Sequence, residues 1–296
     1  MILGEYNNGN GRVRIYDDGT KVIGYVGDRY RPEFPDSIDV KITDYCDMGC
    51  PYCHESSTRR GKHASWATLS WFIGQVSPYT EIAIGGGDPM SHPHLDRFLS
   101  ECSKNRIICN ITVNQGHLGR YLERLLMYSG EGKIRGIGVS IVNRNYKHLK
   151  ALLESGAHVV PHVIAGVTDI EQAKEVAEMC GKLLILGYKR HGRGVEYFSD
   201  EVMDRITQYR DFMSINASIA FDTLAFEQLR LAQVLPKEYI ELHYLGGEGE
   251  VSLYVDCVTK TIAVSSYSDE RMPLMPIKEY FRLIKLDAYH TNRQLI

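Results

Sequence analysis

Short apolar runs alternate with amphipathic segments through the middle of the chain. Apolar runs of strand length lie at about 37–43, 81–85, 107–113, 134–141, 158–165 and 182–187. Segments with apolar residues at helical spacing follow at about 65–77, 93–104, 117–128, 145–155, 169–180 and 198–213. This succession of βα units predicts an α/β fold, a partial (β/α)6 barrel of the TIM type, with function at the carboxyl ends of its parallel strands.

Both ends of the chain depart from this pattern. Residues 12–16 and 21–25 flank the turn sequence DDGT and predict an N-terminal β-hairpin. The C-terminal part predicts a strand, a helix, three β-like runs and a closing helix, at 218–222, 223–235, 239–245, 251–256, 261–265 and 276–286. The last two β-like runs predict a hairpin that either caps the barrel or extends its sheet. The chain is therefore expected to divide into an appendage and linker (1–36), a barrel (37–215) and a β-rich extension that covers the barrel (216–296).

The composition narrows the class of protein without naming a function. The 296 residues are 44% hydrophobic and 24% charged, with a net charge of −3. No run approaches the roughly 18 apolar residues of a membrane span, and the first residues lack the pattern of a signal peptide. We therefore expect a cytoplasmic protein without membrane contact. The small net charge gives no overall attraction for nucleic acid.

The chemistry concentrates in the sequence TDYCDMGCPYCHESS, which follows the first barrel strand. Cys46, Cys50 and Cys53 fall within eight residues, whereas the other four of the seven cysteines are scattered. This distribution is not a disulfide framework, and clustered thiols in a reducing compartment indicate a metal site. Two interpretations remain open from the spacing. His54 completes a closed Cys3His zinc site in a binding module, or three thiolates bind an iron–sulfur cluster.

A glycine-rich turn follows the second barrel strand, in the sequence EIAIGGGDPMSHP. Gly86 and Gly87 allow a ligand to approach the backbone closely, and Asp88 adds a carboxylate. The turn lacks the spacing of a P-loop. Taken alone, it is better explained as a tight turn between strand and helix.

Together the two motifs resemble the signature of the radical S-adenosylmethionine (SAM) superfamily. The spacing Cys46-x3-Cys50-x2-Cys53, with Tyr52 before the last cysteine, is similar to the cluster motif of that family, and GGDP is similar to its GGE-type motif. The resemblance covers about residues 37–215. It implies a [4Fe–4S] cluster held by the three cysteines, with the fourth iron left for the amino and carboxylate groups of SAM. His54 is then a neighbour of the cluster and not a ligand.

The resemblance also implies which residues contact SAM. Tyr52 is expected near the adenine, and the Gly86 and Gly87 carbonyls with the Asp88 side chain near the methionyl ammonium. The family usually has Glu where this chain has Asp88, which is shorter by one methylene. Further SAM contacts are expected at the ends of later strands, from Ser140, Ile164, Gly166, Leu186 and Gly187.

Other polar residues near strand ends are candidates for contact with a substrate. The set expected to face the barrel mouth comprises Asn114, His162, Tyr188 and Lys189. Two basic loops, at 59–63 and 189–193, lie on the same predicted face. They are either solvated loops or, through residues such as Arg193, a binding surface for phosphate or carboxylate.

The resemblance further implies an activity and its partners. A flavodoxin or ferredoxin is expected to reduce the cluster, and SAM is expected to be cleaved to methionine and a 5′-deoxyadenosyl radical. The radical abstracts hydrogen from an unidentified substrate, either an anionic small molecule, a nucleotide or nucleic acid, or a peptide. The predicted hairpin near Cys257 resembles the start of a SPASM-type extension. Such extensions carry several cysteines, so a second cluster is not expected.

Overall fold

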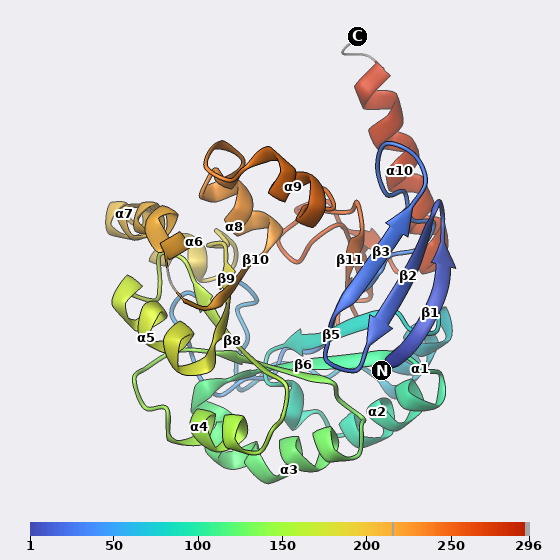
Figure 1. Ribbon diagram of the computed structural model, residues 1–296. Helices are drawn as coiled ribbons and strands as arrows, with labels where there is room; N and C mark the ends of the chain where they lie inside the picture. The colour runs from blue at the N-terminus through green and yellow to red at the C-terminus, as the bar shows by residue number, and fades with distance from the viewer. Residues whose placement is uncertain (215, 294–296) are drawn as a thin grey trace.

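The computed structural model describes residues 1–214 and 216–293 (Figure 1). Its main body is one ten-stranded sheet with the order β10-β9-β8-β7-β6-β5-β4-β11-β12-β13. The strands are β4 (Ser37–Thr43), β5 (Glu81–Gly86), β6 (Ile108–Asn114), β7 (Gly136–Ser140), β8 (Val159–Ile164), β9 (Lys182–Leu186), β10 (Ser218–Phe221), β11 (Ser252–Asp256), β12 (Thr261–Ala263) and β13 (Met272–Pro273). Neighbouring strands from β10 to β11 pair in parallel, and the sheet curves without closing on itself.

The helices are α1 (Trp66–Gln75), α2 (Leu95–Lys104), α3 (Leu118–Gly130), α4 (Lys147–Glu154), α5 (Ile170–Cys180), α6 (Gly194–Tyr197), α7 (Asp200–Gln208), α8 (Thr223–Gln228), α9 (Lys237–His243) and α10 (Ile277–Arg293). Helices α1 to α5 lie along the outside of the curved sheet (Figure 1). Within the described residues, none of these helices combines the length and the apolar composition that crossing a bilayer requires. The predicted partial barrel is thus confirmed, and its strands agree closely with the apolar runs of the sequence.

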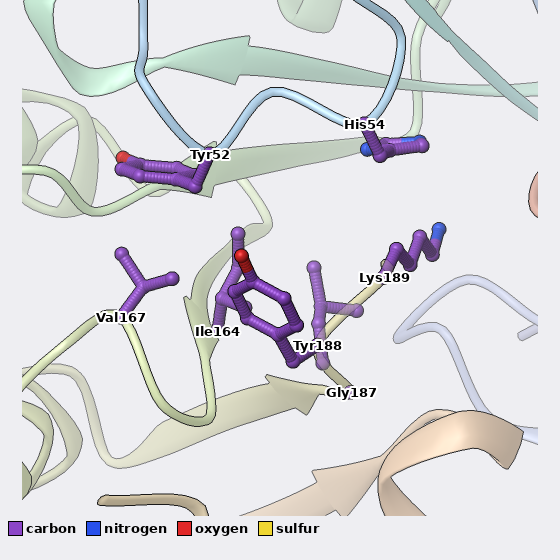
Figure 2. A pocket seen from close by; sticks show the side chains of 8 residues that line it. Tyr52, His54, Ile164, Val167, Gly187, Tyr188 and Lys189 are labelled. Atoms are coloured by element: carbon purple, nitrogen blue, oxygen red, sulfur yellow. The ribbon is translucent and has the colours of Figure 1, made fainter. Parts of the chain in front are cut away.

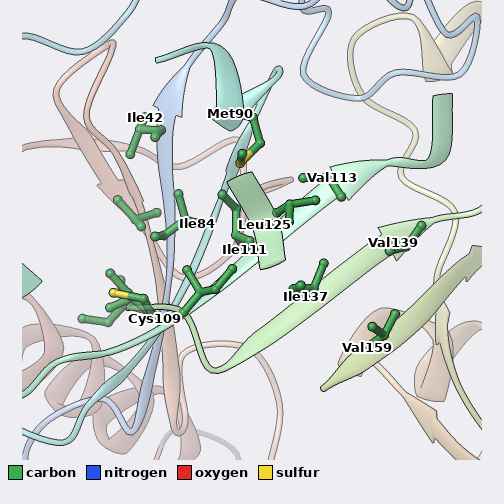
Figure 3. Close-up of a cluster of buried hydrophobic side chains, with 14 of the residues drawn as sticks. Ile42, Ile84, Met90, Cys109, Ile111, Val113, Leu125, Ile137, Val139 and Val159 are labelled. Carbon is green, nitrogen blue, oxygen red and sulfur yellow. The ribbon is translucent and has the colours of Figure 1, made fainter. Parts of the chain in front are cut away.

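The two faces of the sheet differ in chemistry because strand side chains alternate. On the outer face Ile84, Ile111 and Val139 are buried against the helices, as Figure 3 shows around Leu125 of α3. The intervening positions face the concave side and are half-exposed. They include Asn110, Thr112, Asn114, Ser140 and His162. The concave face is therefore the polar face of the sheet, and the polar side chains near the strand ends lie on it.

Four details differ from the sequence prediction. The predicted N-terminal hairpin gains a third strand, so β1 (Ile2–Asn8), β2 (Gly11–Tyr16) and β3 (Lys21–Tyr25) form a separate antiparallel sheet. The short strand β13 and the short helix α6 were also missed. Pro93 precedes α2 by two residues instead of opening it. Strand β1 carries poor strand formers such as Gly4 and Asn8, and pairing with β2 overrides their preference.

The run at 239–245 is wrongly predicted as β structure. It forms most of helix α9, in which Lys237 lies 3.4 Å from Glu241 and the rings of Tyr239 and His243 lie 4.2 Å apart. Both pairs have the i,i+4 spacing at which helical side chains meet. The aromatic and β-branched residues that suggested a strand are therefore used at helical spacing.

The C-terminal strands extend the main sheet, which is one of the two predicted arrangements. β11 pairs in parallel with β4, and β12 pairs antiparallel with β11 as the predicted hairpin. Strands on both sides of residue 215 therefore belong to the same sheet. The division of the chain into three domains stays a prediction.

Candidate functional site

The cysteine loop, residues 44–63, follows β4 and folds back on itself. The Cys46 N–H donates to the Thr58 carbonyl (2.9 Å), and the Cys53 N–H donates to the Cys50 carbonyl (3.3 Å). Cys46, Cys50 and Cys53 carry free, half-buried thiols. Burial raises the pKa of the Cys46 and Cys50 thiols, and the neighbouring thiols raise it further. Bound iron offsets this effect because a coordinated thiol loses its proton.

Arg193, in the loop that follows β9, holds the cysteine loop through three hydrogen bonds. Its Nε donates to the Cys50 carbonyl (2.9 Å), its Nη1 to the Ser57 carbonyl (3.1 Å), and its backbone N–H to the Cys53 carbonyl (3.1 Å). The guanidinium that the sequence suggested for a substrate anion thus faces backbone oxygens of the cysteine loop. Within the same basic loop, Arg190 stacks on Phe198, with 4.2 Å from the guanidinium carbon to the ring centroid.

The glycine turn after β5 docks directly on the cysteine loop. The Gly87 N–H donates to the Thr43 carbonyl (2.7 Å), and the Asp88 N–H donates to the Tyr45 carbonyl (2.6 Å). A Cβ at Gly87 would lie 2.2 Å from the Tyr45 oxygen, and Gly86 has a φ of +109°. The glycines that suggested close approach of a ligand are therefore required by the approach of the cysteine loop.

Asp88 is fully buried, and only one of its carboxylate oxygens has a partner. Oδ2 accepts from the Tyr121 hydroxyl (2.8 Å), whereas Oδ1 accepts no hydrogen bond. The Nδ1 of His117 lies 3.7 Å from this free oxygen, and its Nε2 donates to Asp47 in the cysteine loop (2.6 Å). A buried carboxylate oxygen without a donor is costly, so its environment suits a cationic ligand group.

The spacing of the thiols distinguishes between the two metal interpretations. Among the described residues, only Asp47, Asp88 and His117 bring ligand atoms from three His, Cys, Asp or Glu side chains all within 4.8 Å of one another. The three thiols are thus spread more widely than the ligands of one zinc ion, whose sulfurs lie within about 4 Å at Zn–S bonds of about 2.3 Å. Ligands of a four-iron cluster are more widely separated, so the loop fits a cluster better than a single ion.

The His54 ring is not placed as a fourth metal ligand. Its Nε2 lies 3.4 Å from Glu55 Oε1, and its side chain lines a pocket on the far side from the glycine turn. Burial lowers the pKa of His54, although Glu55 opposes this effect. The ring is therefore a neutral neighbour of the cysteine loop.

One pocket brings together most of the predicted adenine contacts. Figure 2 shows Tyr52 and His54 of the cysteine loop facing the ends of β8 and β9 across this pocket. Its other walls come from Ile164, Val167, Leu186, Gly187, Tyr188 and Lys189. Gly166 is absent from the lining. A Cβ there would meet Ile206 and Val202 of α7 within 3 Å, so this glycine allows the helix to pack closely.

The predicted polar residues form a row across the concave face. Asn114, Ser140 and His162 are paired at the same level on β6, β7 and β8. Asn114 Nδ2 donates to Cys50 Sγ (3.7 Å), which places this amide beside the cysteines. The His162 ring lies over Gly138, and burial lowers the pKa of His162 to about 4. The row therefore presents neutral hydrogen-bonding groups.

A buried charge network behind the cysteine loop was missed by sequence reasoning. Lys41 Nζ lies 2.6 Å from Asp44, 2.6 Å from Glu55 and 3.3 Å from Asp256. The Tyr254 hydroxyl donates to Glu55 (3.0 Å). These carboxylates outweigh the effect of burial and hold the pKa of Lys41 above its usual value. A lysine between Val40 and Ile42 in the first barrel strand was the signal available in the sequence.

Comparison with known proteins identifies the family. Residues 40–217 match the sequence model of the radical SAM superfamily. The chain belongs to the radical SAM superfamily. It is therefore an enzyme of a family that uses a [4Fe–4S] cluster and SAM. No curated protein matches the chain in sequence.

Solved structures support the fold of this radical SAM enzyme. SuiB of Streptococcus suis bound to the precursor peptide SuiA has a TM-score of 0.61 at 15% identity, over 85% of this chain and 65% of that one. SuiB bound to S-adenosylmethionine has a TM-score of 0.59 at 15% identity, over 82% and 64%. The chain thus spans less than two thirds of the length of SuiB.

Proposed function

We propose that Cys46, Cys50 and Cys53 hold the [4Fe–4S] cluster and leave one iron for SAM. The observation that carries this proposal is the arrangement of three free thiols in one loop that docks on the glycine turn. The thiols are too far apart for one zinc ion and lie beside a buried carboxylate oxygen with no donor. A zinc-stabilised binding module would need the thiols and His54 to converge, and they do not.

The SAM molecule fits between this cluster and the pocket under Tyr52. The free Oδ1 of Asp88 is the acceptor for the methionyl ammonium. Tyr52, Ile164 and Leu186 line the pocket that would take the adenine. Ser140 ends β7, which lies between β5 and the strands β8 and β9 in the sheet, and it is our candidate contact for the ribose or carboxylate of SAM.

The residues of the concave face bind and orient the reactants and exclude water. When bound, the cluster and SAM supply one-electron cleavage to methionine and a 5′-deoxyadenosyl radical, which takes a hydrogen atom from the substrate. The external electron is expected from a flavodoxin or ferredoxin. Asn114 and His162 are the candidates for hydrogen bonds to a substrate, and Lys189 lines the pocket. Tyr188 is buried, and its hydroxyl donates to the Gly194 carbonyl (2.7 Å).

A peptide is the substrate class that we favour over an anionic small molecule or nucleic acid. The arginines of the second basic loop are used within the protein, since Arg193 binds carbonyls and Arg190 stacks on Phe198. Lys189 donates to Ser266 (2.8 Å). Few cations of this second loop therefore remain for an anion. The likeness to SuiB in complex with its precursor peptide supports the same choice at the level of the fold.

Anaerobic reconstitution tests this proposal. The protein should be brown, with absorbance near ~400 nm, and should cleave SAM when dithionite is supplied. Cys50→Ala should abolish both properties, whereas Cys180→Ala, at a half-buried thiol outside the loop, should retain them. A colourless protein that holds stoichiometric zinc under these conditions would contradict the proposal. Transfer of deuterium from labelled peptides into 5′-deoxyadenosine then tests the substrate class.

A further inference from the structure

Four side chains from four segments of the chain form a continuous chain of contacts beside the cysteines. Asp47 lies in the cysteine loop, Asp88 in the glycine turn, His117 directly after β6, and Tyr121 in α3. His117 Nε2 donates to Asp47 Oδ1 (2.6 Å), and Tyr121 donates to Asp88 Oδ2 (2.8 Å). The rings of His117 and Tyr121 pack edge to face, with centroids 6.0 Å apart. Each of these two rings is at least 90% buried.

We propose that His117 and Tyr121 are positioning residues that aim Asp88 Oδ1 at the methionyl ammonium of SAM. This inference rests on the proposed function, because it assumes that Asp88 receives that group. The two carboxylate oxygens of Asp88 differ in their partners, and this difference supports the inference. Tyr121 fixes Oδ2, so the carboxylate cannot turn freely, and Oδ1 is left without a donor.

The short side chain of Asp88 makes this support necessary. A glutamate could reach a ligand by choosing among several rotamers, whereas an aspartate has only two side-chain torsions with which to adjust. A fixed acceptor spends less conformational entropy when the ligand binds. The Tyr121 hydroxyl and the packed imidazole therefore hold the short Asp88 side chain in one orientation before the ligand binds.

The same chain of contacts links the Asp88 carboxylate to the cluster motif. Asp47 accepts from His117 Nε2 at one carboxylate oxygen (2.6 Å) and from Arg120 Nη2 at the other (3.0 Å). Asp47 lies between two proposed iron ligands, Cys46 and Cys50. The conformation of the cysteine loop therefore affects the packing around Asp88 through the contacts of Asp47 and His117. Cluster binding and SAM binding should be coupled through these contacts.

A divalent cation among Asp47, Asp88 and His117 is the competing explanation, since their ligand atoms lie within 4.8 Å. The imidazole argues against it. One ring nitrogen faces Asp47 and the other faces Asp88, as in a bridge between two carboxylates. A metal ion would need a single nitrogen to point toward both carboxylates.

Paired tyrosine variants on helix α3 test the inference. Tyr128 is also buried and donates to a carboxylate, that of Asp96 (2.5 Å), but it lies two helical turns from Tyr121 along α3. SAM is titrated into the reduced, reconstituted full-length enzyme, and the change in the EPR spectrum of the cluster gives the dissociation constant. Tyr121→Phe should weaken SAM binding about tenfold, as expected for loss of a hydrogen bond to a charged group. Tyr128→Phe should remain within about twofold of wild type.

Two substitutions of His117 separate its two contacts. His117→Gln keeps a donor near Asp47, so it should weaken SAM binding less than His117→Ala does. Iron content and melting temperature are measured for every variant, because a merely structural role would lower these without changing the SAM-dependent EPR signature. Normal SAM affinity and an unchanged signature in both Tyr121→Phe and His117→Ala would overturn the inference while leaving the proposed function intact.

Two other outcomes are also decisive. A wild-type enzyme that assembles no cluster or cleaves no SAM would overturn the proposed function, and the inference with it. A second metal that is bound stoichiometrically by wild type and lost in Asp47→Asn would replace the positioning chain with a cation site.

Discussion

The role of a single residue depends on the partners that the fold gives it. Arg193 was predicted to contact a substrate because arginine suits anions, and that role stays a prediction. Its three hydrogen bonds in the structure all reach carbonyls of the cysteine loop. No local signal in the sequence connects Arg193 to Cys50, which lies 143 residues away. Cys46, Cys50 and Cys53 are different, because their short spacing alone predicted a metal-binding loop.

Arg193→Ala should reduce the amount of cluster that the enzyme retains. The substitution leaves the Cys50 and Ser57 carbonyls without their donor, at a cost of about 1–3 kcal/mol for each buried group. Iron and sulfide per chain, measured after anaerobic reconstitution and desalting, should fall well below wild type. Arg190→Ala is the matched control, since its side chain stacks on Phe198 and does not contact the loop. Equal iron retention in the two variants would show that Arg193 does not support the loop.

At the scale of elements, hydrophobic periodicity predicted the barrel strands well. It worked because the outer face of each strand is covered by helices and needs apolar residues at alternate positions. It failed where other contacts decide the structure, as in β1 and α9. The glycine turn lies between these cases. Its presence was evident from the sequence, but its partner, the backbone of the cysteine loop, was not.

Gly87→Ala should separate the glycine turn from the cysteine loop. Its Cβ would lie 2.2 Å from the Tyr45 oxygen, so the backbone of one segment must move. We expect a lower melting temperature and loss of most of the iron. Gly85→Ala, two residues earlier, is the control, because no atom lies within 4 Å of its Cβ position apart from its chain neighbours. If Gly87→Ala retains as much iron as Gly85→Ala, close docking of the turn is not required.

At the scale of the whole molecule, the C-terminal strands stabilise the site through β4, the strand that precedes the cysteine loop. β11 extends the sheet beside β4 and brings Tyr254 and Asp256 to the buried network around Lys41. Glu55 of this network directly follows the cysteine motif. The sequence predicted a hairpin in this region but not its attachment, because pairing between strands more than 200 residues apart leaves no local pattern.

Tyr254→Phe should destabilise the enzyme by about 1–3 kcal/mol, because it removes a donor from the buried Glu55 carboxylate. Chemical denaturation of the anaerobic protein, followed by circular dichroism, measures this change. Tyr280→Phe in α10 is a suitable control, since Tyr280 is equally buried but makes no side-chain hydrogen bond among the described residues. A loss of stability no greater than that of the control would mean that the network does not depend on this hydroxyl.

The sequence by itself determined the class of this enzyme. The cysteine spacing and the GGDP turn are local patterns, and the βα periodicity follows from burying one face of each strand. Only the tertiary structure decided how these parts meet. The docking of Gly87 on Tyr45, the contacts of Arg193, the chain from Asp47 to Tyr121 and the network at Lys41 all join segments distant in sequence. Such contacts form only when folding brings distant segments together. No local pattern in the sequence encodes them, so they became evident only in the folded molecule.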